Sequence, residues 1–162
     1  MRLEVRPGGE VVLTAPIRAS DALIERFFAA HALWVERHVA RMRKREVVRL
    51  KRSDLPSLKR RAREIAEERS LYFSRAYGVE YSTISIRAQK TRWGSCSRRG
   101  ALSFNYKIAA LPSELADYIV VHEVCHLLAF DHSQKFWDLV ARTVPEHRAL
   151  RKRLRNMTFV QA

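Results

Sequence analysis

The sequence predicts a mixed α+β fold of several helices and a few short strands. Apolar residues recur at helical spacing through four long segments, whereas short alternating runs such as Thr83–Ile86 lie between them. Hydrophobic residues make up 47% and charged residues 30% of the 162 residues, which is an ordinary globular balance. This length suits one domain with a core of its own, with or without an N-terminal extension.

The N-terminal segment predicts a β-hairpin followed by one long helix. Apolar residues alternate on both sides of Pro7-Gly8-Gly9, and Ser20 is a suitable N-cap for a helix that continues to about Arg43. We therefore expect residues 1–46 to form an N-terminal hairpin and helix. Residues 47–56 are basic and end in proline, so we expect a linker there, with the main region at 57–162.

The main region predicts a small antiparallel sheet among helices. A helix from about Leu58 ends at Gly78, and a nearly all-apolar helix, typical of burial, begins at Pro112 and reaches about Ala129. The remaining expected elements are the strand 83–86, a hairpin of 93–97 with 102–106, a fourth helix after 130–132 and a basic helix after Pro145.

Charge and composition exclude several classes of protein. The longest apolar stretch, 119–130, is too short and too polar to span a bilayer. The N-terminus has no apolar signal region, and two cysteines cannot form a disulfide framework, so we expect a soluble cytoplasmic protein. The formal net charge is +14, and the basic residues gather in 37–52, 87–99 and 148–155. Such clusters are either solvated surfaces or contacts for phosphate groups.

The residues His122-Glu123-Val124-Cys125-His126 predict a metal site. On a helix, the two histidines lie on one face, one turn apart, which lets both imidazoles bind one Zn²⁺. Glu123 is rotated about 100° from His122, so it flanks the ion and can take a proton from water held there. A pair of hydrogen-bonded core histidines is the alternative, but it leaves Glu123 as a costly buried charge.

A catalytic zinc site needs three protein ligands and one open position. His132 is the expected third ligand, provided that the helix stops near Ala129 and the chain folds back; Asp138 and Glu146 are weaker candidates. We expect Cys96 and Cys125 to have packing roles.

Several segments together resemble the YgjP-like metallopeptidase family, whose members are zincins related to the SprT-like and Wss1-like peptidases. The resemblance covers about residues 84–145 and is carried by Arg92-Trp93-Gly94-Ser95-Cys96, Leu102-Ser103-Phe104-Asn105, the segment 117–127, Asp131-His132-Ser133 and Phe136-Trp137.

The resemblance implies a zincin-like catalytic region at 57–162. It implies His122, His126 and His132 as ligands of one Zn²⁺ per chain and Glu123 as the catalytic acid/base. It also implies that the strand 102–106 borders the cleft, where an extended peptide could pair with it. The group that stabilises the oxyanion is left open among Arg92, Tyr106, Tyr118 and His147.

Three functions fit these residues. The first is a zinc-dependent peptidase acting on peptides or proteins. The second is a metal-dependent pyrophosphohydrolase of nucleoside triphosphates such as UTP, an activity also attributed to members of this family. It would use the cations Arg87, Lys90, Arg92, Arg98 and Arg99. The third is a nucleic-acid-associated protease of the SprT-like kind, in which the clusters 37–52 and 148–155 would bind the phosphate groups of the nucleic acid.

Overall fold

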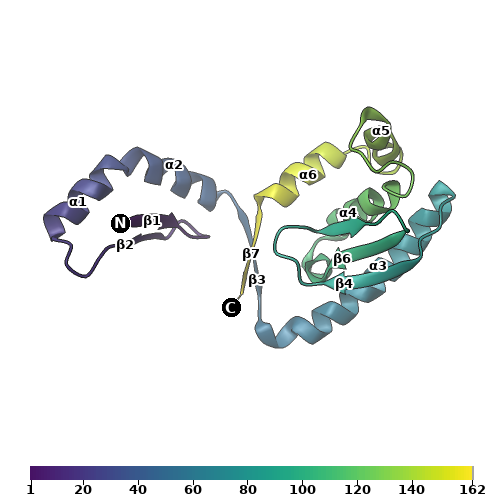
Figure 1. Cartoon of the computed structure of the whole chain (residues 1–162), viewed down its shortest axis with the longest axis horizontal. Coiled ribbons are helices and arrows are strands. Elements are labelled where there is room, and N and C mark those ends of the chain that lie inside the picture. Colours follow the sequence, from purple (N-terminus) through teal and green to yellow (C-terminus); the bar gives the residue numbers. More distant parts are fainter. Residues whose placement is uncertain (162) are drawn as a thin grey trace. The chain divides into compact units, whose positions relative to one another are not determined.

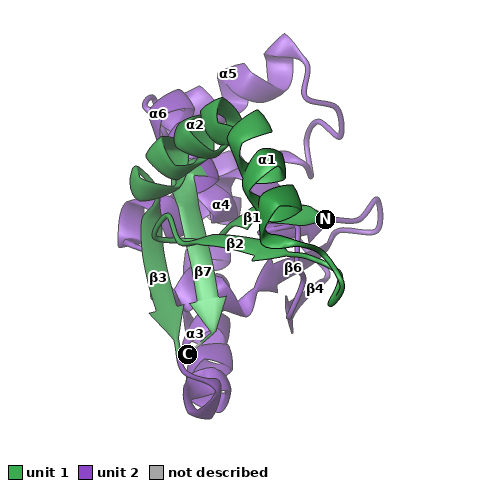
Figure 2. Ribbon diagram, turned by 90° about the vertical axis from the view of Figure 1, so that its left-hand side faces the viewer, with its two compact units in different colours: residues 1–50, 156–162 green, residues 51–155 purple. Residues whose placement is uncertain are grey.

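The computed structural model describes residues 1–161 and divides the chain into two compact units, coloured separately in Figure 2. Unit 1 comprises residues 1–50 and 156–162, and unit 2 comprises 51–155. No helix within residues 1–161 combines the length and the apolar character that a membrane span requires.

Unit 1 begins with the predicted hairpin. Strands β1 (Arg2–Val5) and β2 (Val11–Thr14) pair antiparallel, and the turn between them contains Gly8 and Gly9, both with positive φ. Strand β3 (Glu46–Leu50) pairs parallel with β7 (Met157–Gln161) from the far end of the chain, as Figure 1 shows.

The prediction of a single long helix after Ser20 is wrong, because the structure has two helices there. Helix α1 (Asp21–Ala30) and helix α2 (Ala32–Arg43) are separated by His31, whose φ of −111° and ψ of 9° are not helical. The backbone N–H of His31 bonds to the carbonyl of Phe28, three residues back, which tightens the last turn of α1.

The stretch 47–56, predicted as a linker, carries regular structure. It includes most of β3, a short 3-10 helix at Arg52–Asp54 and the start of α3 (Leu55–Tyr77). The boundary between the units nevertheless falls within this stretch, after Leu50. At the other end, residues 156–161 belong to unit 1, whereas we expected them in the main region.

Unit 2 is built on a three-stranded sheet in the order β4-β6-β5 (Figure 1). Strand β5 (Gly94–Cys96) forms the predicted antiparallel hairpin with β6 (Ala101–Asn105). Strand β4 (Thr83–Arg87) pairs parallel with β6, so the sheet is mixed and not antiparallel throughout. In the chain β5 lies between β4 and β6. In the sheet it pairs with the opposite edge of β6, which leaves the other edge free for β4.

Helix α3 and helix α4 (Ser113–Cys125) contact each other and the sheet, and they enclose the core. Gly78 ends α3 in the left-handed conformation, with φ of 65° and ψ of 37°, as its position in the sequence predicts. Arg69 of α3 donates two hydrogen bonds of 2.6 Å to the carboxylate of Asp117 in α4, which fixes the two helices together. The remaining elements are the 3-10 helix Tyr106–Ala110, α5 (Gln134–Thr143) and α6 (His147–Asn156).

Candidate metal centre

Helix α4 carries the first part of the site because it is buried on almost every side. Nine of its thirteen residues are buried, including Glu123. The helix ends at Cys125, and His126 is its C-cap, so the helix stops four residues earlier than we predicted. The chain then turns through residues 126–129 and brings His132 back toward the end of α4.

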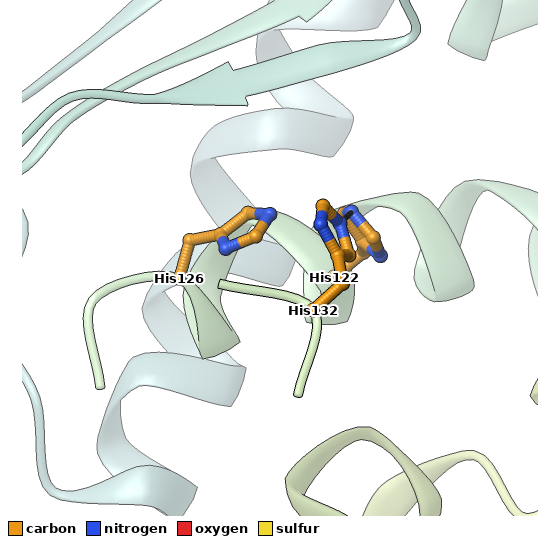
Figure 3. Close-up of side chains that lie close together, drawn as sticks. All are labelled: His122, His126 and His132. Atoms are coloured by element: carbon orange, nitrogen blue, oxygen red, sulfur yellow. Dashed lines mark hydrogen bonds between the residues drawn. The ribbon is translucent and has the colours of Figure 1, made fainter. Parts of the chain in front are cut away.

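The three histidines predicted as ligands lie together (Figure 3). One ring nitrogen from each of His122, His126 and His132 lies within 4.8 Å of the other two. The His122 and His132 rings lie beside each other, and the His126 ring is perpendicular to that of His122. Within residues 1–161, this is the one group of histidine, cysteine and acidic side chains that could hold a metal ion.

The spacing of one pair of nitrogens, those of His122 and His132, matches two ligands of a tetrahedral ion. The Nε2 atoms of His122 and His132 are 3.2 Å apart. Two nitrogen ligands of tetrahedral Zn²⁺, each about 2.0–2.1 Å from the ion, lie about 3.3 Å apart. The Nδ1–H of His126 donates to the carbonyl of Ala129 at 3.0 Å, which leaves Nε2 unprotonated and available as a ligand. The donor set and its tautomer therefore suit a divalent cation.

Burial favours the neutral form of the His122 and His126 imidazoles, which is the form that binds metals. Desolvation, assisted by the neighbouring rings of His126 and His132, lowers the pKa of His122 to about 3. Desolvation also lowers the pKa of His126. The Nδ1 atom of His122 is buried without a hydrogen-bond partner, whereas its Nε2 atom faces that of His132.

Glu123 is held against the strand β5 by a close approach to Gly94. Glu123 is 5% exposed, and burial raises the pKa of its carboxyl to about 8, against the opposing positive charge of Arg92. A Cβ atom on Gly94 would lie 2.6 Å from both Cγ and Oε1 of Glu123. Only glycine leaves room for the carboxylate at this position. The sequence alone placed Gly94 in the family motif but did not explain why a glycine is needed there.

Asn105 organises the loop that precedes β5. Its buried side-chain amide donates to the carbonyls of Gln89 and Arg92, at 2.7 and 2.9 Å, and its Oδ1 accepts from the backbone N–H of Lys107. The backbone N–H of Asn105 also bonds to the carbonyl of Trp93. One residue thus fixes the loop that places Arg92 and Trp93 beside the histidines. An asparagine at the end of a predicted strand was the available signal, and we did not use it.

Aromatic side chains of α5 enclose the histidines. The Phe136 ring is stacked on His126 at 4.5 Å and meets His122 edge-on at 4.9 Å. Trp137 contacts His132 and is stacked on His147 at 5.4 Å. This apolar shell lowers the local polarity, which explains the desolvation of the imidazoles.

Two hollows adjoin the site. A cavity of about 250 Å³ is lined by β5, the three histidines, Glu123, Arg92 and Phe130. A second cavity, of about 410 Å³, adjoins His122 and Glu123 from another side. We call the second one the arginine cavity, because three arginines line it. Its residues are Thr91, Arg92, Trp93, Gly94, Tyr118, Ile119, His122, Glu123, Arg151, Leu154 and Arg155.

The strand that borders the histidines is β5, which corrects our expectation for strand 102–106. Strand β6 occupies the middle of the sheet and pairs on both sides, so its backbone is not available to a peptide. Strand β5 is an edge strand, and its residues line the smaller cavity. The mixed sheet explains the difference: parallel β4 covers the side of β6 that the hairpin leaves open.

Other candidate residues lie apart from the cluster. Asp138 accepts a hydrogen bond from Gln134 on its own helix, and neither Asp138 nor Glu146 belongs to the three-histidine group. Of the oxyanion candidates, Arg92 and Tyr118 line the arginine cavity, whereas Tyr106 and His147 do not. Cys125 is fully buried, and Cys96 lines the smaller cavity with a thiol pKa that burial raises to about 11.

The sheet, the helix α4 and the three-histidine cluster together form an α+β fold with a candidate metal centre, and the fold is similar to that of a solved metallopeptidase. The chain belongs to the YgjP-like metallopeptidase family, since its residues 55–157 match the YgjP-like, metallopeptidase domain. The crystal structure of the metallopeptidase zymogen of Pyrococcus abyssi abylysin has a similar fold, with 24% sequence identity and a TM-score of 0.52. The similarity covers 57% of this chain and 99% of that one. No curated protein matches the chain.

Proposed function

We propose that this protein is a zinc-dependent peptidase with one Zn²⁺ per chain. The observation that carries the proposal is the convergence of three imidazole nitrogens within 4.8 Å of one another, beside a buried carboxylate. His122, His126 and His132 would hold the ion, and three protein ligands leave a position open for water and substrate.

The chemistry divides between the cation and the chain. A bound Zn²⁺ supplies Lewis-acid polarisation and lowers the pKa of water to about 7. Glu123 accepts a proton from the attacking water at its carboxylate and returns it to the leaving amine. Its raised pKa is that of the metal-free chain, and positive charge among the histidines would lower it toward the ionised form that a base requires.

The edge strand β5 is the natural support for an extended substrate. Within residues 1–161 no strand pairs with it on the side away from β6, and its residues Gly94, Ser95 and Cys96 line the cavity that contains the histidines. A peptide added to this edge would gain main-chain hydrogen bonds and would pass the metal centre. Tyr118 and Arg92 remain the candidates for the group that stabilises the oxyanion.

Metal content and peptide cleavage, measured together, test the proposal. We expect about one Zn²⁺ per purified chain and a large loss in His126→Ala, since one ligand of three is removed. In Glu123→Gln we expect zinc to be retained and cleavage of an unfolded protein such as casein to fall by about 10²–10⁴-fold. Equal cleavage by wild type and Glu123→Gln would contradict the proposal, as would a wild-type protein that binds no zinc.

The nucleotide pyrophosphohydrolase is the second candidate, because the arginine cavity offers three cations next to the site. Of the five cations that we predicted for a triphosphate, Arg92 alone lines that cavity, and Arg98 and Arg99 line a different hollow. Turnover of UTP by wild type but not by Glu123→Gln, with no cleavage of casein, would favour this candidate over the peptidase.

A further inference from the structure

The arginine cavity is strongly basic although it adjoins the proposed catalytic carboxylate. Arg92 reaches it from the loop before β5, and Arg151 and Arg155 reach it from α6. Within residues 1–161, none of the three guanidinium groups forms an ion pair, whereas Arg153 of the same helix bonds to Glu114 at 2.9 Å. The only acidic side chain in the lining is Glu123.

Arg151 packs on an aromatic ring that also contacts the histidine cluster. Its guanidinium lies over the Trp137 ring, 5.1 Å from the centroid, and Trp137 contacts His132 on the other side of the site. An arginine that is already held in place loses less side-chain entropy when it binds a ligand. Arg151 and Arg155 are four residues apart on α6, so both lie on the same face of the helix.

A buried phenol completes the lining. Tyr118 is 5% exposed and lines the cavity. Arg151 and Arg155 line the same cavity as this phenol. A neutral hydroxyl donor beside two cations suits a carboxylate.

We propose that the arginine cavity is a specificity subsite for a carboxylate of the peptide substrate, with Arg151 and Arg155 as the residues that recognise it. The inference rests on the proposed peptidase function and names its substrate class: peptides with a negative charge close to the cleaved bond. Such a carboxylate has two sources, an Asp or Glu side chain and the C-terminus of the peptide.

A peptide library digested with the enzyme, with cleavage sites read by mass spectrometry, distinguishes these sources. An acidic side chain predicts enrichment of Asp and Glu at one position next to the cleaved bond. A C-terminal carboxylate predicts cleavage at a fixed distance from the end of the peptide, which amidation of that end abolishes. Absence of both patterns in a library that the enzyme cleaves would overturn the subsite while leaving the peptidase intact.

The variants Arg151→Gln, Arg155→Gln and the double variant test the residues. With a pair of peptides that differ only by Glu or Gln at the enriched position, we expect wild type to prefer Glu in kcat/KM by about tenfold. The double variant should show no preference, and its zinc content should equal that of wild type. Arg148→Gln is the matched control, because Arg148 is exposed on the same helix and does not line the cavity.

Binding to the Glu123→Gln protein gives a readout that does not depend on turnover. Its affinity for the Glu peptide should exceed that for the Gln peptide, and the difference should vanish when Arg151 and Arg155 are also replaced. A preference that survives in the double variant would assign the carboxylate to the metal and overturn the inference. No cleavage of any peptide by wild type would reject the peptidase function and the subsite with it.

Discussion

The two units of this chain differ in how much they bury. Within residues 1–161, the buried apolar side chains of unit 1 are Val5, Val35 and Met157, whereas unit 2 encloses many fully buried ones, Phe104 and Phe136 among them. Every buried polar or ionisable side chain also lies in unit 2. Burial shifts pKa values and fixes side chains, so the unit with the dense core is the one that can hold reactive groups in place.

The largest expected effect concerns stability. Leu115 of α4 is completely buried and Leu33 of α2 is 69% exposed, so the same substitution probes both units. Leu115→Ala should lower the free energy of unfolding by about 2–5 kcal/mol, since it leaves a cavity. Leu33→Ala should change it by less than about 0.5 kcal/mol. Urea denaturation measures both, and equal losses would show that the units do not differ as described.

Gly94→Ala should impair catalysis while leaving the metal in place. The new Cβ would lie 2.6 Å from Glu123, so the carboxylate must move, and its three nearest neighbours are all atoms of Glu123 and none of a histidine. We expect kcat for peptide cleavage to fall by about 10–100-fold with unchanged zinc content. Leu33→Ala is the control from unit 1, because Leu33 is 69% exposed. Full activity in Gly94→Ala would mean that the position of Glu123 is not critical.

The contributions of His122 and Glu123 should make the metal-free protein most stable between about pH 4.5 and 6.5. The pKa of His122 falls from 6.5 to about 3 on folding, so the unfolded chain binds more protons and acidification below 6.5 destabilises the fold. The pKa of Glu123 rises from 4.5 to about 8, so stability falls as the pH rises through that range. Each group contributes at most about 1.4 kcal/mol per pH unit.

Thermal unfolding after treatment with a chelator measures this profile. Glu123→Gln should remove the loss on the alkaline side, and His122→Asn should remove the loss on the acidic side. A profile that neither substitution changes would contradict the assigned shifts.

The smallest expected effect concerns the basic residues of unit 1. If the cluster 37–52 binds nucleic acid, as the SprT-like alternative predicts, Arg41→Gln with Arg43→Gln should reduce the slope of log affinity against log salt by up to about 2. Binding to duplex DNA at several salt concentrations tests this prediction, with peptide cleavage as the control. No binding of wild type at physiological ionic strength would reject it.

Local spacing in the sequence was enough to predict which residues gather at the metal centre. His122 and His126 are one helical turn apart, and the short break before His132 allows the chain to return. Glu123 is predictable for the same reason. It follows His122 directly on the helix, and the helix geometry fixes its direction relative to the histidines. Their roles as ligands and as acid/base stay predictions that the experiments above address.

The features that sequence reasoning missed depend on contacts between distant residues. Gly94 needs space for Glu123, and Asn105 holds carbonyls 13 and 16 residues away, neither of which a local pattern can reveal. The expectation of an antiparallel sheet was incomplete for the same reason, because the distant strand β4 pairs parallel with β6. The break at His31 was missed because helical spacing of apolar residues continues through it.

The parallel pairing of β3 with β7 has a consequence for how the chain folds during its synthesis. A ribosome releases the N-terminal end first, at about 5–20 residues per second. All of residues 51–155 must therefore emerge before the partner of β3 exists, and until then β3 presents an unsatisfied row of amide groups. While residues 51–155 are being synthesised, unit 1 therefore lacks one of the strands that pair within it.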